Sequence, residues 1–183
     1  EEAQNLLLFI GWDFDTRLAL ELGDRSRRYR LSTFFLRLAR KDRHRQIAIL
    51  KWRFGALKQF LIPTSAWTLV RWAATRAIRF RFDGAHPAGC SHHQKIVVVD
   101  DSIAVCGGID LACGRWDTPQ HLDDDPKRVF PNGKPTKPWH DITMLMDGDV
   151  ATALGELARD RWAVAGGKPL PEVRKVNPKW PND

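Results

Sequence analysis

The residues best suited to chemistry lie between positions 92 and 110, in the stretch HHQKIVVVDDSIAVCGGID. His93 and Lys95 lie two positions apart and lead into the apolar run IVVV, which is typical of a strand. Since alternate residues of a strand share a face, we expect His93 and Lys95 to point to one side and Asp100 to the other. A histidine beside a fixed cation suits the transfer of a phosphoryl group, because the transition state of that reaction is negatively charged.

Metal binding is the alternative chemistry, because His and Asp residues are frequent in this chain. The candidate ligands are His92, His93, His121, His140, Asp123, Asp124 and Asp125. They show neither the H-E-x-x-H spacing nor a comparable ligand pattern, and Lys95 would repel a divalent cation at His93. We therefore expect neither a metal nor another cofactor, and we expect a structural role for His92.

The composition bounds the domain count and the kind of partner. The chain has 183 residues, of which 43% are hydrophobic, and this is enough for one core and one domain. Its 29 Lys and Arg residues exceed its 22 Asp and Glu residues, which gives a net charge of +7. The surplus favours an anionic partner, such as nucleic acid, an anionic membrane surface or a phosphorylated substrate, although it also fits a soluble basic protein.

Much of the positive charge lies in residues 25–58, where basic residues face a single acid, Asp42. The basic residues are Arg25, Arg27, Arg28, Arg30, Arg37, Arg40, Lys41, Arg43, Arg45, Lys51, Arg53 and Lys58. We expect a solvated helix face here, with a phosphate-binding surface as the alternative.

The cysteines and the chain ends give expectations about location. Cys90, Cys106 and Cys113 form an odd set without C-x-x-C spacing, so we expect reduced thiols. The sequence has no uninterrupted run of about 18 apolar residues, so we expect no transmembrane helix in it. Its N-terminal stretch lacks the basic region of a signal peptide. We expect a cytoplasmic location or a peripheral one at the inner face of a membrane. Because the chain lacks an initiating Met, we also expect it to be a piece of a longer protein.

Hydrophobic periodicity predicts alternating strands and helices. Strands are expected at residues 6–12, 17–22, 46–52, 77–82 and 141–147, in addition to the motif strand. Helices are expected after a cap at Ser32, over residues 54–75 with a break at Pro63, and from a cap at Asp149 to the Gly166-Gly167 pair. Residues 114–140 have no usable periodicity, and connections of this length are usually functional or disordered.

This alternation predicts an α/β fold, a mixed β-sheet sandwiched between helices (α/β/α), with the motif strand in the interior. Residues 1–166 would form this domain, and residues 167–183 would form a linker or tail. Trp67, Val70 and Trp72 surround Arg71 in one expected helix, and we favour core packing there over contact with a membrane interface.

The full motif spacing carries a family resemblance. The pattern His93-x-Lys95-x4-Asp100-x6-Gly107-Gly108-x-Asp110 resembles the signature of the phospholipase D (HKD) superfamily. The resemblance extends to GWDFDTRLAL at residues 11–20, to GRWDTPQH at 114–121 and to PWHDITMLMDGDVATALGELARDRW at 138–162. These flanks are more similar to bacterial two-motif phospholipases than to the short single-motif nucleases.

The resemblance implies a role for each motif residue. His93 would attack phosphorus and form a covalent phosphohistidine, while Lys95 would bind the non-bridging oxygens of the phosphate. Asp100 would be structural, and Asp141, in the Trp-His-Asp stretch, would accept a hydrogen bond from His93 and fix its tautomer.

Three further motif positions are less specific. Gly107 and Gly108 would serve the geometry of the backbone. Many family members carry Asn at the position of Asp110, so a phosphate contact and a structural role are both open for this carboxylate.

The sequence contains one such motif, whereas family catalysis uses two His-Lys pairs. We expect the N-terminal half of a longer enzyme, a metal-independent phospholipase D-type phosphodiesterase that hydrolyses or transfers a phospholipid head group. One alternative is a homodimeric single-motif endonuclease that holds DNA or RNA with residues 25–58. A second is a catalytically inactive fragment that binds phosphate or lipid. The expected partners are thus a phosphodiester substrate and a second motif-bearing half or copy, with peripheral contact to an anionic membrane.

Overall fold

A computed structural model of the chain describes residues 3–20, 30–53, 63–173 and 176–177, and a mixed sheet lies at its centre. In spatial order its six strands are β3 (Ile78–Asp83), β2 (Gln46–Trp52), β1 (Leu6–Gly11), β4 (Ile96–Val99), β5 (Ile103–Gly107) and β6 (Thr143–Asp147). The first three in this order are parallel, and β4, β5 and β6 each run antiparallel to the preceding neighbour. The motif strand β4 is therefore interior, as expected.

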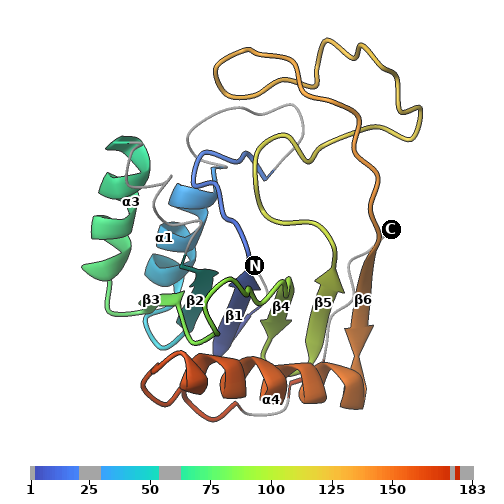
Figure 1. Ribbon diagram of the computed structural model, residues 1–183. Helices are drawn as coiled ribbons and strands as arrows, with labels where there is room; N and C mark the ends of the chain where they lie inside the picture. The colour runs from blue at the N-terminus through green and yellow to red at the C-terminus, as the bar shows by residue number, and fades with distance from the viewer. Residues whose placement is uncertain (1–2, 21–29, 54–62, 174–175, 178–183) are drawn as a thin grey trace.

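Helices cover both faces of this sheet (Figure 1). Helices α1 (Leu31–Lys41) and α3 (Pro63–Ala73) pack on one face, and α4 (Gly148–Val164) packs on the other. The predicted α/β/α sandwich with a mixed sheet is thus confirmed.

The two faces of the central strands explain their continuous apolar sequences. In β1, Leu7 and Phe9 join the core under α1 and α3, whereas Leu6, Leu8 and Ile10 join the core under α4. Because both sides of the strand are covered, no position in it is left for a polar residue.

The motif stretch differs from the expected single strand. Regular pairing begins only at Ile96, and the chain then turns back through Asp100 and Asp101, whose φ angles are 50° and 49°, into β5. Strand β5 was not predicted, because the turn lacks Gly and Pro; Asp is one of the few other residues that tolerate positive φ. Asp100 is separated from His93 because the two lie at opposite ends of β4, and not because they lie on opposite faces.

Other predicted boundaries also shift. The strand expected at residues 17–22 is wrong in its described part, where Asp15 instead binds the backbone and guanidinium N–H groups of Arg17 and forms a turn. Residues 21–22 of that strand and 54–62 of an expected helix lie outside the described residues. Helix α1 begins without a side-chain cap from Ser32, and α4 begins one residue before Asp149.

The beginning of the expected tail contacts the domain. The Trp162 indole N–H donates to the Lys168 carbonyl at 2.8 Å, and Arg79 donates to the Pro169 carbonyl at 2.7 Å. Leu170 packs against the core under α4. The division at residue 167 itself stays a prediction. No helix in the described part of the chain combines the length and apolar character needed to span a bilayer.

Asp100 holds the start of β1 in place. Its carboxylate is 2% exposed and accepts backbone hydrogen bonds from Gln4, Asn5 and Leu6, at 2.5, 2.8 and 2.7 Å. We expect Asp100→Ala to lower the free energy of unfolding by about 2–4 kcal/mol, because it leaves these amides without a partner. Urea denaturation measures the loss. Asp124→Ala, at an exposed position, is the control and should change stability by less than about 0.5 kcal/mol; equal effects of the two changes would contradict the account.

Candidate active site

His93 and Lys95 meet at the end of the sheet where β1 ends and β4 begins. The His93 Nε2 atom lies 2.9 Å from the Lys95 Nζ atom, and Lys95 is only 8% exposed. On its other side, Lys95 Nζ lies 3.5 Å from Asp110 Oδ2. The two residues that the sequence selected for chemistry are thus brought together, and the ammonium group has a carboxylate behind it.

Asp110 connects this pair to β1. Its Oδ1 atom accepts hydrogen bonds from the backbone N–H groups of Trp12 and Asp13, both at 3.0 Å, and the residue is 6% exposed. Both carboxylate oxygens therefore have partners within the protein. Of the two roles that the sequence left open, this geometry favours the structural one.

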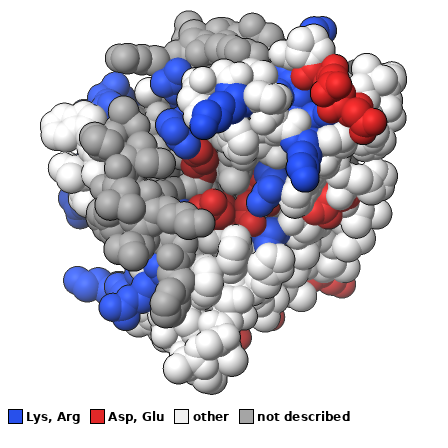
Figure 2. Space-filling model, turned by 45° about the horizontal axis from the view of Figure 1, so that its top comes forward, with Lys and Arg blue, Asp and Glu red and all other residues white. Residues whose placement is uncertain are grey.

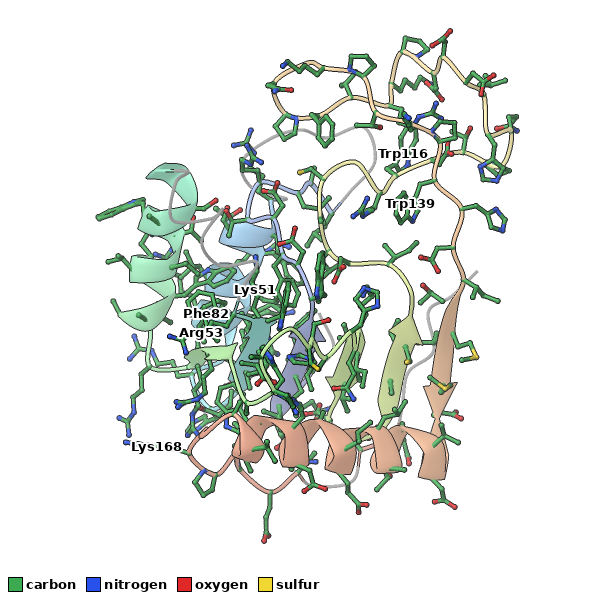
Figure 3. The ribbon with its side chains drawn as sticks, viewed as in Figure 1. Lys51, Arg53, Phe82, Trp116, Trp139 and Lys168 are labelled. Carbon is green, nitrogen blue, oxygen red and sulfur yellow. The ribbon has the colours of Figure 1, made fainter. Side chains whose placement is uncertain are left out.

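Lys51 is a site residue that the sequence did not single out. Its side chain is fully buried, and its Nζ atom lies 2.7 Å from Asp13 Oδ1 at the end of β1. Burial lowers the pKa of Lys51, and the hydrogen bond that its ammonium group donates to Asp13 only partly offsets this effect. Figure 3 shows Lys51 among the buried side chains at the end of β2. A charged residue inside the apolar run QIAILKW was the available signal.

Two stacked tryptophan rings, those of Trp12 and Trp52, lie beside His93. The Trp12 ring lies 5.6 Å from the imidazole of His93 in an edge-to-face arrangement and stacks on Trp52 at 5.0 Å. The Trp52 indole N–H donates to His86 Nε2 at 3.1 Å. Both tryptophans lie where a parallel strand ends, so the sheet itself brings them to one edge and fixes one side of the His93 ring.

The two motif glycines let another segment pass beside β5. A β-carbon at Gly107 would lie 2.7 Å from the Ile142 carbonyl oxygen, and one at Gly108 would lie 2.6 Å from Asp141 Cγ. Only glycine fits such a close approach. Asp141 therefore lies beside Gly108, directly after the C-terminal end of β5.

The described residues show no hydrogen bond between Asp141 and His93. Asp141 is exposed, and its Oδ1 atom accepts a hydrogen bond from the Ile142 backbone at 2.8 Å. Its role in orienting His93 stays a prediction.

His92 points away from the pair and into a buried ionic cluster. Its Nε2 atom lies 2.8 Å from Asp83 Oδ2, and Asp83 is fully buried at the end of β3. The same carboxylate accepts hydrogen bonds from Arg161 of α4 at 2.5 Å and from the Ala85 amide at 2.9 Å. The residue before His93 is thereby fixed to β3 and α4, in line with the structural role expected for it.

This cluster shifts two pKa values. Burial alone would raise the pKa of Asp83, but the hydrogen bonds from Arg161 and Ala85 and the charge of His92 lower it below its ordinary value. Burial lowers the pKa of His92, against the attraction of Asp83. The imidazole is therefore harder to protonate in the folded protein than in the unfolded chain.

The long segment of residues 114–140 is organised around Asp117. Its carboxylate accepts hydrogen bonds from Arg128 and from the Trp139 backbone, both at 2.6 Å, and lies 3.1 Å from His121 Nδ1. Burial would raise the pKa of Asp117, but these bonds hold it well below its ordinary range. The contacts of the Asp117 carboxylate thus hold together a segment that has no helix or extended strand of its own.

This segment lies above the end of the sheet that carries His93 (Figure 1). Trp116 and Trp139 belong to this segment and lie on its lower side in Figure 3, toward the sheet. The Arg115 guanidinium stacks over the Trp139 ring at 4.0 Å. Figure 2, which brings this end of the molecule forward, shows acidic and basic side chains next to each other near its middle.

Within residues 3–20, 30–53, 63–173 and 176–177, no group of three His, Cys, Asp or Glu side chains is placed to hold a metal ion. His121 Nε2 and His140 Nδ1 lie 3.3 Å apart, but His121 uses its other nitrogen on Asp117.

A His and a Lys paired at one end of a mixed α/β/α sheet fit the class of enzymes that cleave phosphodiesters. A family model described as Phospholipase D matches residues 1–177, and the chain therefore belongs to the phospholipase D family. This confirms the resemblance that the motif spacing indicated.

Individual relatives agree with this assignment. Phospholipase D alpha 1 of Nicotiana tabacum is 38% identical over 104 residues, and phospholipase D C of Dictyostelium discoideum is 33% identical over 100 residues. These alignments cover 43% and 42% of this chain but only 13% and 6% of those proteins. The phospholipase D family member Nuc of Salmonella typhimurium superimposes with a TM-score of 0.50 at 15% identity, covering 88% of this chain and 80% of Nuc, which shows a shared fold.

The buried His92 predicts how stability depends on pH. Because the folded protein binds this proton more weakly than the unfolded chain, the contribution of His92 is fully present above its ordinary pKa of 6.5 and decreases as the pH falls below it. Asp83, whose pKa is lowered from 3.8, loses its contribution only in more acidic solution. We expect the Tm to fall between about pH 7.5 and about pH 5.5, and to fall less in His92→Gln.

Thermal scans of both proteins across this range measure the effect. His44→Gln, at an exposed histidine, should keep the dependence of the unchanged protein. If His92→Gln shows the same decrease as the unchanged protein, the protonation of His92 does not control it.

Proposed function

We propose that this chain is one half of a phospholipase D-type phosphodiesterase, which hydrolyses a phospholipid or transfers its head group through a phosphohistidine on His93. The observation that carries the proposal is the 2.9 Å contact between His93 Nε2 and Lys95 Nζ on the family motif. The relatives named phospholipase D support a phospholipid as the substrate. As each alignment spans a small part of the relative, the activity of the whole protein is part of the proposal.

The contact with Lys95 suits nucleophilic attack by His93. An ammonium group can only donate, so Nε2 must accept from it, and the ring proton then lies on Nδ1. In the proposed reaction, the Nε2 lone pair forms the bond to phosphorus while the bond to the leaving oxygen breaks. Lys95 turns to the non-bridging oxygens and stabilises their charge. Water or an alcohol then attacks phosphorus and releases His93.

Asp110 and Trp12 would prepare these residues for the reaction. Asp110 holds Lys95 close to the site, because its Oδ2 atom lies 3.5 Å from the Lys95 Nζ atom and balances the charge of this buried ammonium group. The edge-to-face contact with the Trp12 ring limits the rotation of the His93 imidazole. Both effects reduce the reorganisation that the protein needs before attack.

A second lobe would complete the site. The leaving oxygen needs a proton, and in the family pattern this comes from a second His-Lys pair, whereas the present sequence holds one H-x-K-x4-D motif. We propose that the other pair comes from the remainder of a longer protein, because the sequences that flank the motif in this chain resemble those of two-motif phospholipases. The alternative is that a second copy of this chain supplies the pair.

Strand β6 is the surface that best fits this lobe. It is the outermost strand on its side of the described sheet, and its large apolar side chains are exposed: Ile142, just before it, by 76%, Met144 by 56% and Leu145 by 37%. Exposed apolar residues on an unpaired sheet edge invite a partner. Because Asp141 and Gly108 adjoin this strand, a lobe bound here would face the site.

An activated substrate can test His93 without the second lobe. The p-nitrophenolate group leaves without a proton, so bis(p-nitrophenyl) phosphate requires only the nucleophile and the cation. We expect release of p-nitrophenolate and an acid-labile nitrophenyl-phosphate adduct on His93, identified by mass spectrometry of the intact and digested chain. His93→Ala should form no adduct.

Lys95→Met provides the matched comparison, because it keeps the length of the side chain and removes the charge. The adduct should form at least about 100-fold more slowly, as expected on loss of one electrostatic contact to the transition state. Undiminished p-nitrophenolate release by folded His93→Ala, or an adduct on another residue, would contradict the proposal. A DNA oligonucleotide in the same assay tests the endonuclease alternative.

A further inference from the structure

We infer that the outer surface of helices α1 and α3 docks onto an anionic phospholipid bilayer. The inference goes beyond the proposed reaction, because it concerns a surface away from His93 and would hold whatever phosphodiester the site cleaves. It rests on exposed apolar side chains, on the charge of two helices, and on the position of both relative to the site.

Helix α3 presents apolar residues on two sides. Trp72 and Leu69 are 1% and 9% exposed and belong to the core, and for Trp72 this confirms the packing expected from the sequence. Trp67 and Val70, by contrast, are 65% and 57% exposed and lie three positions apart, on the same outer side. The core packing expected for Trp67 and Val70 is therefore wrong, because the core covers only one side of α3. A tryptophan on an exposed helix face is typical of segments that lie in a bilayer interface.

The charged residues within α1 and α3 are all basic. Arg40 and Lys41 are exposed in the last turn of α1, and Arg71 lies in the last turn of α3. Neither helix contains an acidic residue. Basic residues beside exposed apolar ones are the combination that binds anionic lipid, since the charges attract the surface and the apolar side chains enter it.

The two helices form one surface. The rings of Phe35 in α1 and Trp72 in α3 lie 5.3 Å apart, and the Trp72 indole N–H donates to the Ser32 carbonyl at 3.2 Å. Figure 1 shows α3 as the outermost element on this side of the molecule. The basic end of α1 and the apolar side of α3 can therefore meet one flat partner together.

The position of α3 also relates this surface to the site. Helix α3 begins near the end of the sheet where β2 finishes with Trp52, and it runs back along the sheet (Figure 1). Trp67 lies in the first half of α3 and so nearer to the end of the sheet that carries His93. A bilayer bound along α3 would therefore lie at the flank of the sheet, and its contact with Trp67 would be nearer to the site than its contact with Arg71.

The opposite layer provides an internal comparison. Helix α4 also exposes apolar residues, among them Val164 at 61%, but it carries Asp149, Glu156 and Asp160. Its two arginines, Arg159 and Arg161, are bound to Asp101 and Asp83. An anionic surface is therefore attracted to the layer of α1 and α3 and not to α4, and this difference orients the molecule.

Vesicle co-sedimentation of the whole chain tests the inference. Vesicles of phosphatidylcholine alone are compared with vesicles containing about 30% phosphatidylserine, at about 0.1 M and about 0.5 M salt. We expect binding that requires phosphatidylserine and weakens at the higher salt concentration. Trp67→Ser and Val70→Ser should each weaken it by about tenfold, and so should the double change Arg40→Glu and Lys41→Glu.

Val164→Ser is the matched control, because it makes the same change at similar exposure on α4, and it should leave binding unchanged. Circular dichroism confirms that each variant is folded. The inference would be overturned if Val70→Ser and Val164→Ser weakened vesicle binding equally, or if binding did not depend on phosphatidylserine. So would tighter binding of a DNA duplex that is insensitive to Trp67→Ser, since this would identify a nucleic-acid surface. His93→Ala should bind vesicles normally, so failure here and failure of the phosphohistidine proposal are distinguishable.

Discussion

The candidate site depends on the hydrogen bonds of one buried carboxylate, Asp110. One of its oxygens accepts the backbone N–H groups of Trp12 and Asp13, and the other faces the ammonium group of Lys95. It therefore joins Trp12, which lies 98 positions earlier in the sequence and follows β1, to Lys95, which precedes the motif strand. Without it, Lys95 would be a buried cation without a partner, and the Trp12 ring would not be held against His93.

Two other buried carboxylates repeat this arrangement. Asp100 binds the amides at the start of β1, and Asp83 binds Arg161 and lies against His92. Each joins segments that lie far apart in the sequence, and each is at most 2% exposed. Such contacts are specific because a buried carboxylate without its donors is costly. The apolar cores hold the sheet between its helices, and these carboxylates set the ends of its strands, where the chemistry is proposed.

Local sequence patterns predicted the layers of the fold well and the connections less well. The strand at residues 46–52 was predicted with its observed bounds, and the interior place of the motif strand was predicted from the alternation of strands and helices. Strand β5 was missed because Asp100 and Asp101 turn the chain without Gly or Pro. The burial of Lys51 depends on its ion pair with Asp13, and the conformation of residues 114–140 depends on the contacts of Asp117. The periodicity of the sequence carries no information about such contacts.

The contact between His93 and Lys95 is the centre of the account, and a crystal structure with bound vanadate examines it most directly. Vanadate adopts the trigonal bipyramidal geometry of a phosphoryl group under attack. We predict a vanadium atom bonded to His93 Nε2, with an oxygen within hydrogen-bond distance of Lys95 Nζ and Asp110 still bound to Trp12 and Asp13. Vanadate bound away from His93, for example at Arg115, with the contact between His93 and Lys95 unchanged, would contradict it.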